Sequence, residues 1–318
     1  MLTQLLERRL LVVLGKGGVG KSTLSAAIAI HAARSGIRTL LMETDSRAPM
    51  ASVLGIKPSF EPAATSAGFS TMLLEGGHAL DEYLGLVLPG RAVLKAVFAN
   101  RLYQFFVQAA PGLRELMMLG KVYYEVAQKD QRGEHWDLVI VDAPASGQAL
   151  SLLKMPTAAR ATFGASIVGQ EADNIERMLH DRKTCAIVEV TTPETLAVSE
   201  LLETQKALDA IDLHPAAIFL NRASSVDYDA GDVADFARRL ASNRKINQLD
   251  QLTEIARAQL ARAAQTPKAR AKIARHSGSL LLEVPDFPNY HGQALLNHLA
   301  SFFASRLNTS ARHGAAKR

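Results

Sequence analysis

The feature that most constrains the fold is a glycine-rich segment, GKGGVGKST, at residues 15–23 of the 318-residue chain. It follows a short apolar run, LLVVL at 10–14, which is typical of a strand buried on both faces of a parallel sheet. It precedes a stretch rich in Ala, Ile and Leu that is expected to be helical to about Ser35. A strand, a glycine-rich turn and a helix in this order predict a phosphate-binding loop.

Residues 15–22 match the pattern GxxxxGK[ST] in full. Glycine lets consecutive backbone N–H groups converge on phosphate oxygens, in conformations that a Cβ would oppose. Lys21 can then reach the β- and γ-phosphates, and the Ser22 hydroxyl can bind Mg²⁺. We therefore expect ATP to be held by Gly15, Gly17, Gly18, Val19, Gly20, Lys21, Ser22 and Thr23.

Two aspartates follow apolar segments that are expected to be strands. Asp142 closes DLVIVD at 137–142, where P-loop enzymes carry a carboxylate that holds Mg²⁺ directly or through water. Asp45 comes just after a second strand at 37–43 and is a candidate to orient or deprotonate the attacking water. Either aspartate can instead merely cap the turn after its strand. The small residues and prolines at 46–49 and 143–147 suit loops that rearrange when the γ-phosphate is lost.

The remaining chain predicts an α/β fold, a doubly wound and mostly parallel sheet in one P-loop domain that spans residues 1–318. Helical patterns separate the expected strands, which lie at 10–14, 37–43, 137–142, 184–191, 216–221 and 279–285. Residues 61–131 lack a strand signal and are expected to form a helical insertion, and 227–276 are also expected to be helical. The polar, basic tail at 308–318 is expected to be flexible.

Lys16 lies directly after the first glycine of the loop, where the ordinary pattern has no lysine. In this it resembles the deviant Walker A group, in which a lysine at this place crosses a dimer interface and neutralises phosphate charge on the other subunit's nucleotide. Such a lysine acts electrostatically like an arginine finger supplied in trans. The resemblance implies a homodimer, or a pair with a paralogue, that faces itself across two nucleotides. The alternative is a solvated loop lysine.

Most of the chain resembles the ArsA/Get3 family of ATPases, which comprises arsenite-pump ATPase subunits and tail-anchored-protein targeting factors. The resemblance rests on GKGGVGKST at 15–23, ETDSRA at 43–48, DLVIVDAPASGQALSLLKMP at 137–156, VEVTTPETLAVSE at 188–200 and AIFLNR at 217–222. It implies that 43–48 and 137–156 are switch I and switch II. It also implies that Asn221 hydrogen-bonds adenine, that Pro285 lies near the second base contact, and that Glu194 reaches the other subunit's nucleotide.

The same resemblance places 61–131 where the targeting factors build an apolar client groove, and it implies a nucleotide-switched client or partner protein. The departures limit what transfers. Asp45 is followed by Ser46, Arg47 and Ala48 where the targeting factors have Pro-Ala-His. Cys185 is the only cysteine, so neither the zinc-binding pair nor the arsenite-binding thiolates can form, and no zinc is expected.

A ParA/MinD-like positioning ATPase that acts on DNA or membrane is the alternative. A stripe on residues 292–307 (Leu295, Leu299, Phe302, Phe303 and Leu307) could bind lipid, but we expect it to pack on the sheet. The basic residues from Arg257 to Arg275 would suit DNA, but we expect a solvated helical face. We therefore expect no nucleic acid, at most peripheral membrane association and a cytoplasmic protein, since neither a signal peptide nor an 18-residue apolar run is present.

Overall fold

The structure, a computed structural model, describes residues 2–87, 112–127, 136–241 and 249–315. Within these residues, eight strands form one sheet in the order β3-β4-β2-β5-β1-β6-β7-β8. The strands are β1 (Leu10–Gly15), β2 (Thr39–Glu43), β3 (Ala63–Ala64), β4 (Ser70–Leu73), β5 (Leu138–Asp142), β6 (Cys185–Thr191), β7 (Pro215–Ala223) and β8 (Leu280–Pro285). All neighbours pair in parallel except β3, which is antiparallel to β4.

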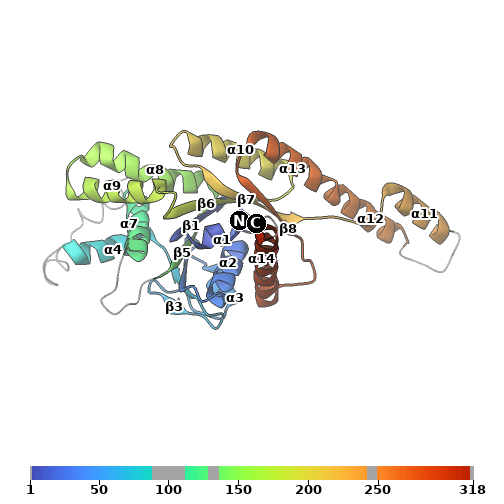
Figure 1. The fold of residues 1–318 in the computed structure, drawn as a ribbon, viewed down its shortest axis with the longest axis horizontal. Coiled ribbons are helices and arrows are strands. Elements are labelled where there is room, and N and C mark those ends of the chain that lie inside the picture. Colours follow the sequence, from blue (N-terminus) through green and yellow to red (C-terminus); the bar gives the residue numbers. More distant parts are fainter. Residues whose placement is uncertain (1, 88–111, 128–135, 242–248, 316–318) are drawn as a thin grey trace.

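Helices cover both faces of this sheet (Figure 1). They are α1 (Leu2–Leu6), α2 (Lys21–Arg34), α3 (Pro49–Val53), α4 (Gly76–Val87), α7 (Leu113–Ala127), α8 (Ser146–Phe163), α9 (Ile167–His180), α10 (Thr195–Asp209), α11 (Ala230–Ala241), α12 (Leu249–Ala263), α13 (Gln265–His276) and α14 (Gly292–Ala315). One apolar cluster joins the sheet to α2 and α14, and a second joins the opposite face to α7, α8 and α9. The predicted doubly wound α/β fold is confirmed.

The central strands are apolar because both of their faces are covered. Every residue of β1, β2, β5 and β6 is buried, as expected for parallel strands between two helical layers. β1 pairs with β5 on one side and with β6 on the other. Its carboxyl end, from which the glycine-rich loop emerges, therefore lies in the middle of the sheet, at the kind of place where open α/β sheets bind ligands.

The apolar stripe of α14 packs on the sheet, as expected. Leu299 and Phe303 are buried in the cluster with α2, and the ring of Phe303 lies 5.8 Å from that of Phe219 on β7. Leu295 and Phe302 pack at the edge of the same cluster, while the side chain of Leu307 lies outside the described part. Among the helices that the structure describes, none combines the length and the apolar character that crossing a membrane requires.

One expectation about a segment is wrong. Residues 61–131 are not purely helical, since β3 and β4 lie at 63–64 and 70–73 before α4 and α7. β4 has only four residues, and half of them are polar, so it lacks the apolar run that marks the central strands. Thr71 is tolerated because its hydroxyl donates to the Leu41 carbonyl and to Glu43. Residues 88–111 and 128–131 of the predicted insertion lie outside the described residues.

The tail that is expected to be flexible begins within α14, which continues to Ala315. Extending an existing helix needs no new nucleation, and the tail contains Ala and Arg, which favour helix. Residues 316–318 are not described. At 227–276 the helical expectation holds: α11 and α12 project from the body of the molecule at the end opposite α4 (Figure 1).

Candidate active site

A cavity of 730 Å³ opens at the carboxyl ends of β1, β2 and β5. Its walls are the glycine-rich loop and the start of α2, parts of the segments 44–50 and 142–148, and Arg222. It brings together Gly17, Gly18, Gly20, Lys21, Ser22, Thr23, Asp45 and Asp142 from the residues that the sequence singled out. The glycine-rich loop and the segments 44–50 and 142–148, the predicted switches, are therefore three walls of one cavity.

The glycine-rich loop takes a conformation that needs glycine. Gly18 and Gly20 have φ values of 85° and 97°, in the left-handed region that L side chains rarely adopt. A Cβ on Gly20 would also collide with the side-chain amide of Asn221. α2 begins at Lys21 without a side-chain cap, so its first N–H groups are open to an anion.

Lys21 is folded into this loop. Its side chain is buried (9% exposed), and Nζ donates a hydrogen bond to the Lys16 carbonyl at 3.1 Å. Burial lowers the pKa of Lys21, while the carboxylates of Asp142 and Glu200 oppose that shift. Without nucleotide, the Lys21 ammonium therefore donates to the Lys16 carbonyl. A bound polyphosphate would take the place of this carbonyl as its partner.

Asp142 is a buried carboxylate (3% exposed) at the end of β5. Burial raises its pKa to about 6, although a hydrogen bond with Ser22 and the charge of Lys21 lower it. Its Oδ1 has no hydrogen-bond partner among the described residues. Hydroxyl and carboxylate oxygens are ligands that Mg²⁺ prefers, so Ser22 and Asp142 fit a metal ion that nucleotide phosphates and water would complete.

No other metal site is evident in the described part of the chain, where no group of three or more His, Cys, Asp or Glu side chains could hold an ion. Cys185 is buried in β6, and burial raises the pKa of its thiol to about 12. This cysteine therefore stays a thiol at neutral pH and makes a poor ligand.

Asp45 faces the cavity but is bound to its neighbour Arg47. Oδ1 accepts from the Arg47 backbone N–H and from Nε, each at 3.0 Å, and Nη2 lies 2.6 Å from Oδ2. These contacts hold the pKa of Asp45 below its usual range. The Arg47 side chain is 85% exposed, so nothing but this contact restrains it.

Switch I is anchored behind Asp45 by a second carboxylate. Glu43 is fully buried at the end of β2, and its oxygens accept from the backbone N–H groups of Met50 and Ala51, at 2.8 and 2.9 Å. Ala48 between them is buried in a left-handed conformation, with φ of 39°. The segment from Thr44 to Pro49 is therefore held at both ends by Glu43, with backbone strain at Ala48.

A second cavity, of 210 Å³, adjoins the first on the far side of Gly20. Asn221, near the carboxyl end of β7, and Pro285, the last residue of β8, both line it, together with Phe287, Tyr290 and His291. Asn221 Nδ2 donates to the Val19 carbonyl at 2.8 Å. This cavity has the aromatic and amide groups that suit a nucleotide base, and it meets the phosphate cavity at Gly20, Thr23 and Arg222.

Sequence reasoning missed Arg222, Phe287 and Tyr290. Arg222 lines both cavities from an irregular part of β7, with φ of 54°. Arg222 lies near the carboxyl end of β7, and Phe287 and Tyr290 follow that of β8; this position is the signal that could have found them.

Lys16 and Glu194 do not line either cavity, and neither do Gly15 and Val19. Lys16 Nζ lies 3.6 Å from Oε2 of Glu200 on α10. Glu194 is exposed as the residue that precedes the first turn of α10. Within one chain, these two residues are therefore not brought to the phosphates.

Comparison with known proteins agrees with this geometry. A family model described as anion-transporting ATPase matches residues 8–172. "ATPase BagA" of Mycobacterium tuberculosis is 29% identical over 240 residues, which cover 72% of this chain and 69% of that protein. A protein of Halobacterium salinarum named "Putative arsenical pump-driving ATPase" is 27% identical over 264 residues, which cover 78% of this chain and 40% of that protein.

Proposed function

The chain belongs to the anion-transporting ATPase family and hydrolyses ATP, and from this premise we propose that it acts as an MgATP-dependent dimer whose nucleotide state controls the binding of a client or partner protein. The dimer is a homodimer or a pair with a paralogue. The observation that carries the nucleotide part is the convergence of Lys21, Ser22, Asp45 and Asp142 on one cavity.

Each residue has a role in hydrolysis that follows from its place. The backbone of residues 15–20 and the N-terminus of α2 bind the phosphates, and Lys21 offsets the charge that develops on the β- and γ-phosphates. Ser22 and Asp142 would hold Mg²⁺, which would supply further positive charge at the phosphate oxygens. Asp45 leaves Arg47 and accepts a hydrogen bond from the attacking water, which aligns it with the γ-phosphate.

The base is placed by the second cavity. The Asn221 side chain, already oriented by its bond to Val19, hydrogen-bonds adenine, and Pro285 lies beside the same pocket. Lys16 and Glu194 act only across the dimer interface, where Lys16 contacts the phosphates of the other subunit's nucleotide.

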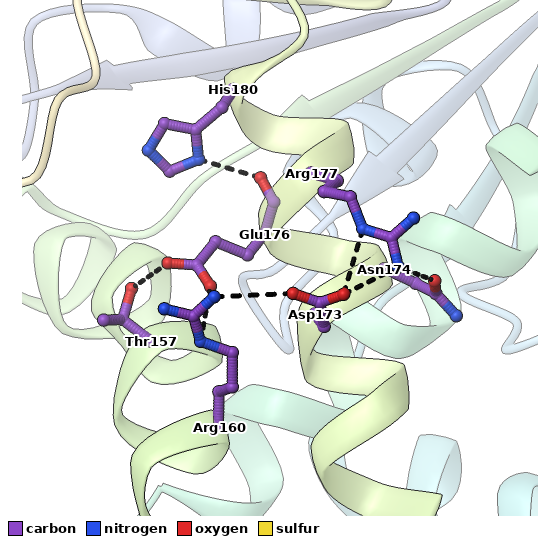
Figure 2. Close-up of polar contacts among 7 residues, drawn as sticks. All are labelled: Thr157, Arg160, Asp173, Asn174, Glu176, Arg177 and His180. Atoms are coloured by element: carbon purple, nitrogen blue, oxygen red, sulfur yellow. Dashed lines mark hydrogen bonds and ion pairs between the residues drawn. The ribbon is translucent and has the colours of Figure 1, made fainter. Parts of the chain in front are cut away.

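The proposal that nucleotide controls a client rests on α8, the helix that continues switch II, and on its contacts with α9. α8 begins at Ser146, four residues after Asp142, and runs alongside α9. Figure 2 shows the polar contacts that join the two helices: Arg160 pairs with Asp173 and Glu176, at 3.5 and 3.4 Å, and Thr157 donates to Glu176 at 2.8 Å. A shift of α8 on loss of the γ-phosphate would therefore move α9 as well.

α9 in turn forms one wall of a third cavity, of 280 Å³, between α4, α7 and α9. Its lining is mainly apolar and includes Tyr83, Met117, Tyr124 and Ile175. Met and Tyr side chains make adaptable contacts, which suits an apolar segment of a client protein. Lys121 also lines it and is neutralised by Glu82 and Glu125, at 2.7 and 3.0 Å.

Arsenite is a poor candidate for the substrate, although one relative's name refers to an arsenical pump. Arsenite capture by protein needs several thiolates, and this chain has only Cys185, a buried thiol. The positioning-ATPase alternative gains no support either. The apolar stripe of α14 is largely covered by the sheet, and two of the basic residues, Arg270 and Lys272, contact Glu283 and Ser199.

The dimer is tested by sedimentation of the Asp45→Asn variant, which we expect to bind MgATP without hydrolysing it. It should sediment as a dimer with MgATP and as a monomer with MgADP. Equal profiles in the two nucleotides would contradict nucleotide-controlled dimerisation. The ATP-trapped dimer then serves as bait for the client, with the ADP form as its control.

Trp136 offers a second readout, because it is the only tryptophan of the chain. Its indole N–H donates to Glu125 on α7 at 2.9 Å, and it precedes β5, the strand that ends in Asp142. If the nucleotide state reaches α7, the fluorescence of Trp136 should differ between the ATP-trapped and ADP forms. A Trp136→Phe variant gives the baseline.

A further inference from the structure

The Lys16 side chain is held within its own subunit. Its Nζ lies 3.6 Å from Oε2 of Glu200, and the two side chains are 39% and 35% exposed. Lys16 belongs to the glycine-rich loop and Glu200 to the middle of α10, so this ion pair joins the loop to a helix far along the chain.

α10 is a rigid support for this carboxylate. Val198 and Leu201, on either side of Glu200, are buried against β7 and α13. Ser199 accepts a hydrogen bond from Lys272 of α13 at 3.1 Å. The charge of Glu200 also acts on Lys21, where it opposes the lowering of the Lys21 pKa by burial. Glu200 is therefore a fixed negative charge beside both lysines of the loop.

The pair contributes little to the stability of the fold. The two charged atoms are partly exposed, and such pairs are typically worth only about 0.2–1 kcal/mol. A contact of this size is easily broken, but a lysine that must reach another subunit has to break it first.

We propose that Glu200 is a positioning residue that holds Lys16 within its own subunit in the absence of a partner and so opposes formation of the ATP-bound dimer. This inference rests on the proposed function, because it presumes that Lys16 acts in trans. It assigns to Glu200 the control of how readily the dimer forms, rather than a role in binding or hydrolysing nucleotide.

The expected size follows from the pair. Removing the ion pair from one lysine should raise the equilibrium constant for dimer formation by about 1.4-fold to about 5-fold, which follows from the free energies typical of exposed pairs. A dimer releases two lysines, so removing the Glu200 charge should lower the dimer dissociation constant by about 2-fold to about 30-fold.

The test compares Glu200→Gln with Glu203→Gln in an Asp45→Asn background, by sedimentation in MgATP across a range of protein concentrations. Glu203 is exposed, one turn further along α10, and the matched control removes the same charge from the same helix. Glu200→Gln should tighten the dimer, whereas Glu203→Gln should leave its dissociation constant within about 1.4-fold of the parent. Raising the salt concentration should reduce the difference, because salt screens the pair.

A second measurement examines the monomer directly. Lysine acylation followed by mass spectrometry reports how available the Lys16 amine is without nucleotide. Glu200→Gln should speed the labelling of Lys16 relative to Lys154, which lies outside the loop, and Glu203→Gln should not.

The outcomes separate the two proposals. If the parent fails to dimerise in MgATP, the proposed function is wrong, and this inference falls with it. If the parent dimerises and Glu200→Gln neither tightens the dimer nor exposes Lys16, only the inference is wrong. A weaker dimer in Glu200→Gln would also overturn it, since Glu200 would then bind across the interface.

Discussion

Arg47 holds the carboxylate of Asp45 at two points, with Nε 3.0 Å from Oδ1 and Nη2 2.6 Å from Oδ2. The candidate water-orienting residue is therefore occupied by a side chain two residues further along. In the proposed mechanism this contact gives way before hydrolysis, and the exposed Arg47 can move into solvent at little cost.

Replacing Arg47 with Ala should shift the acidic limb of the kcat/KM profile to higher pH. The Arg47 contacts lower the pKa of Asp45, and the carboxylate must be ionised to accept a hydrogen bond from water. Without Arg47 the pKa of Asp45 rises, so kcat/KM begins to decrease at a higher pH as the solution is acidified. Arg47→Lys keeps the charge and should retain most of the wild-type profile. An identical limb in Arg47→Ala would show that Asp45 does not control it.

Asp45→Asn should slow kcat at least about 100-fold while changing the affinity for MgATP only a few-fold. General-base and water-orienting groups act mainly in the transition state, so their loss appears in kcat. Single-turnover rates and equilibrium nucleotide titration separate the two quantities. A loss of affinity as large as the loss of rate would mark Asp45 as a structural or Mg²⁺-linked residue.

Asp142→Asn should stabilise the protein in the absence of Mg²⁺ and nucleotide, although it should abolish hydrolysis. Burial raises the pKa of Asp142 to about 6, whereas an unfolded aspartate has a pKa of about 3.9. The folded state therefore disfavours the ionised form, and stability is lost as pH rises from about 4 through about 6. The gain from Asn should reach up to about 3 kcal/mol at pH 8 and vanish near pH 4.

Urea denaturation at the two pH values measures that gain. Asp227→Asn is the control, because Asp227 is exposed and should give no pH-dependent difference. A stability gain of equal size at both pH values would mean that ionisation of Asp142 is not its source.

Asn221→Ala should destabilise the nucleotide-free protein by about 1–3 kcal/mol, since it leaves the Val19 carbonyl without its buried donor. It should also weaken ATP binding, because Val19 belongs to the loop and Asn221 lines the base cavity. Asn221→Asp matches the shape but cannot donate, so it should lose similar stability. Denaturation and nucleotide titration of both variants provide the measurements, and unchanged stability in both would refute the role of this bond.

Mixing Lys16→Ala with Lys21→Ala subunits distinguishes action in trans from action in cis. Each parent should be inactive alone, Lys21→Ala through loss of several kcal/mol of transition-state stabilisation. In the mixed dimer, the site that keeps Lys21 receives an intact Lys16 from its partner, and the other site carries both lesions. Trans action predicts that one site recovers activity. No recovery in confirmed mixed dimers would argue for cis action.

The buried framework of the fold could be predicted, because the central strands are continuous apolar runs whose ends shift by a residue or two between sequence and structure. The short strand β4 could not, since Ser70 and Thr71 give it no such run and its place depends on pairing with β2. The glycine-rich loop was predicted through its spacing, which the phosphate chemistry demands.

The contacts that arrange the site could not be predicted from the sequence. The hydrogen bond from Asn221 to Val19 joins residues that are 202 positions apart in the chain. Neither segment contains a pattern that predicts that the end of β7 lies beside the loop. The pair between Lys16 and Glu200 depends in the same way on where α10 lies. The contact of Arg47 with Asp45 is local, but the sequence does not give the side-chain conformations that make it bidentate.

The long reach of Asn221 has a consequence for how the protein is made. The ribosome synthesises the glycine-rich loop before β6, which flanks β1, and before Asn221, whose amide binds Val19 from 202 residues further along the chain. A chain synthesised only as far as β5 therefore contains the loop, but β1 has no neighbour on the β6 side and the Val19 carbonyl lacks its hydrogen bond from Asn221. We therefore expect ATP to bind in the finished geometry only after the sheet has closed on both sides of β1.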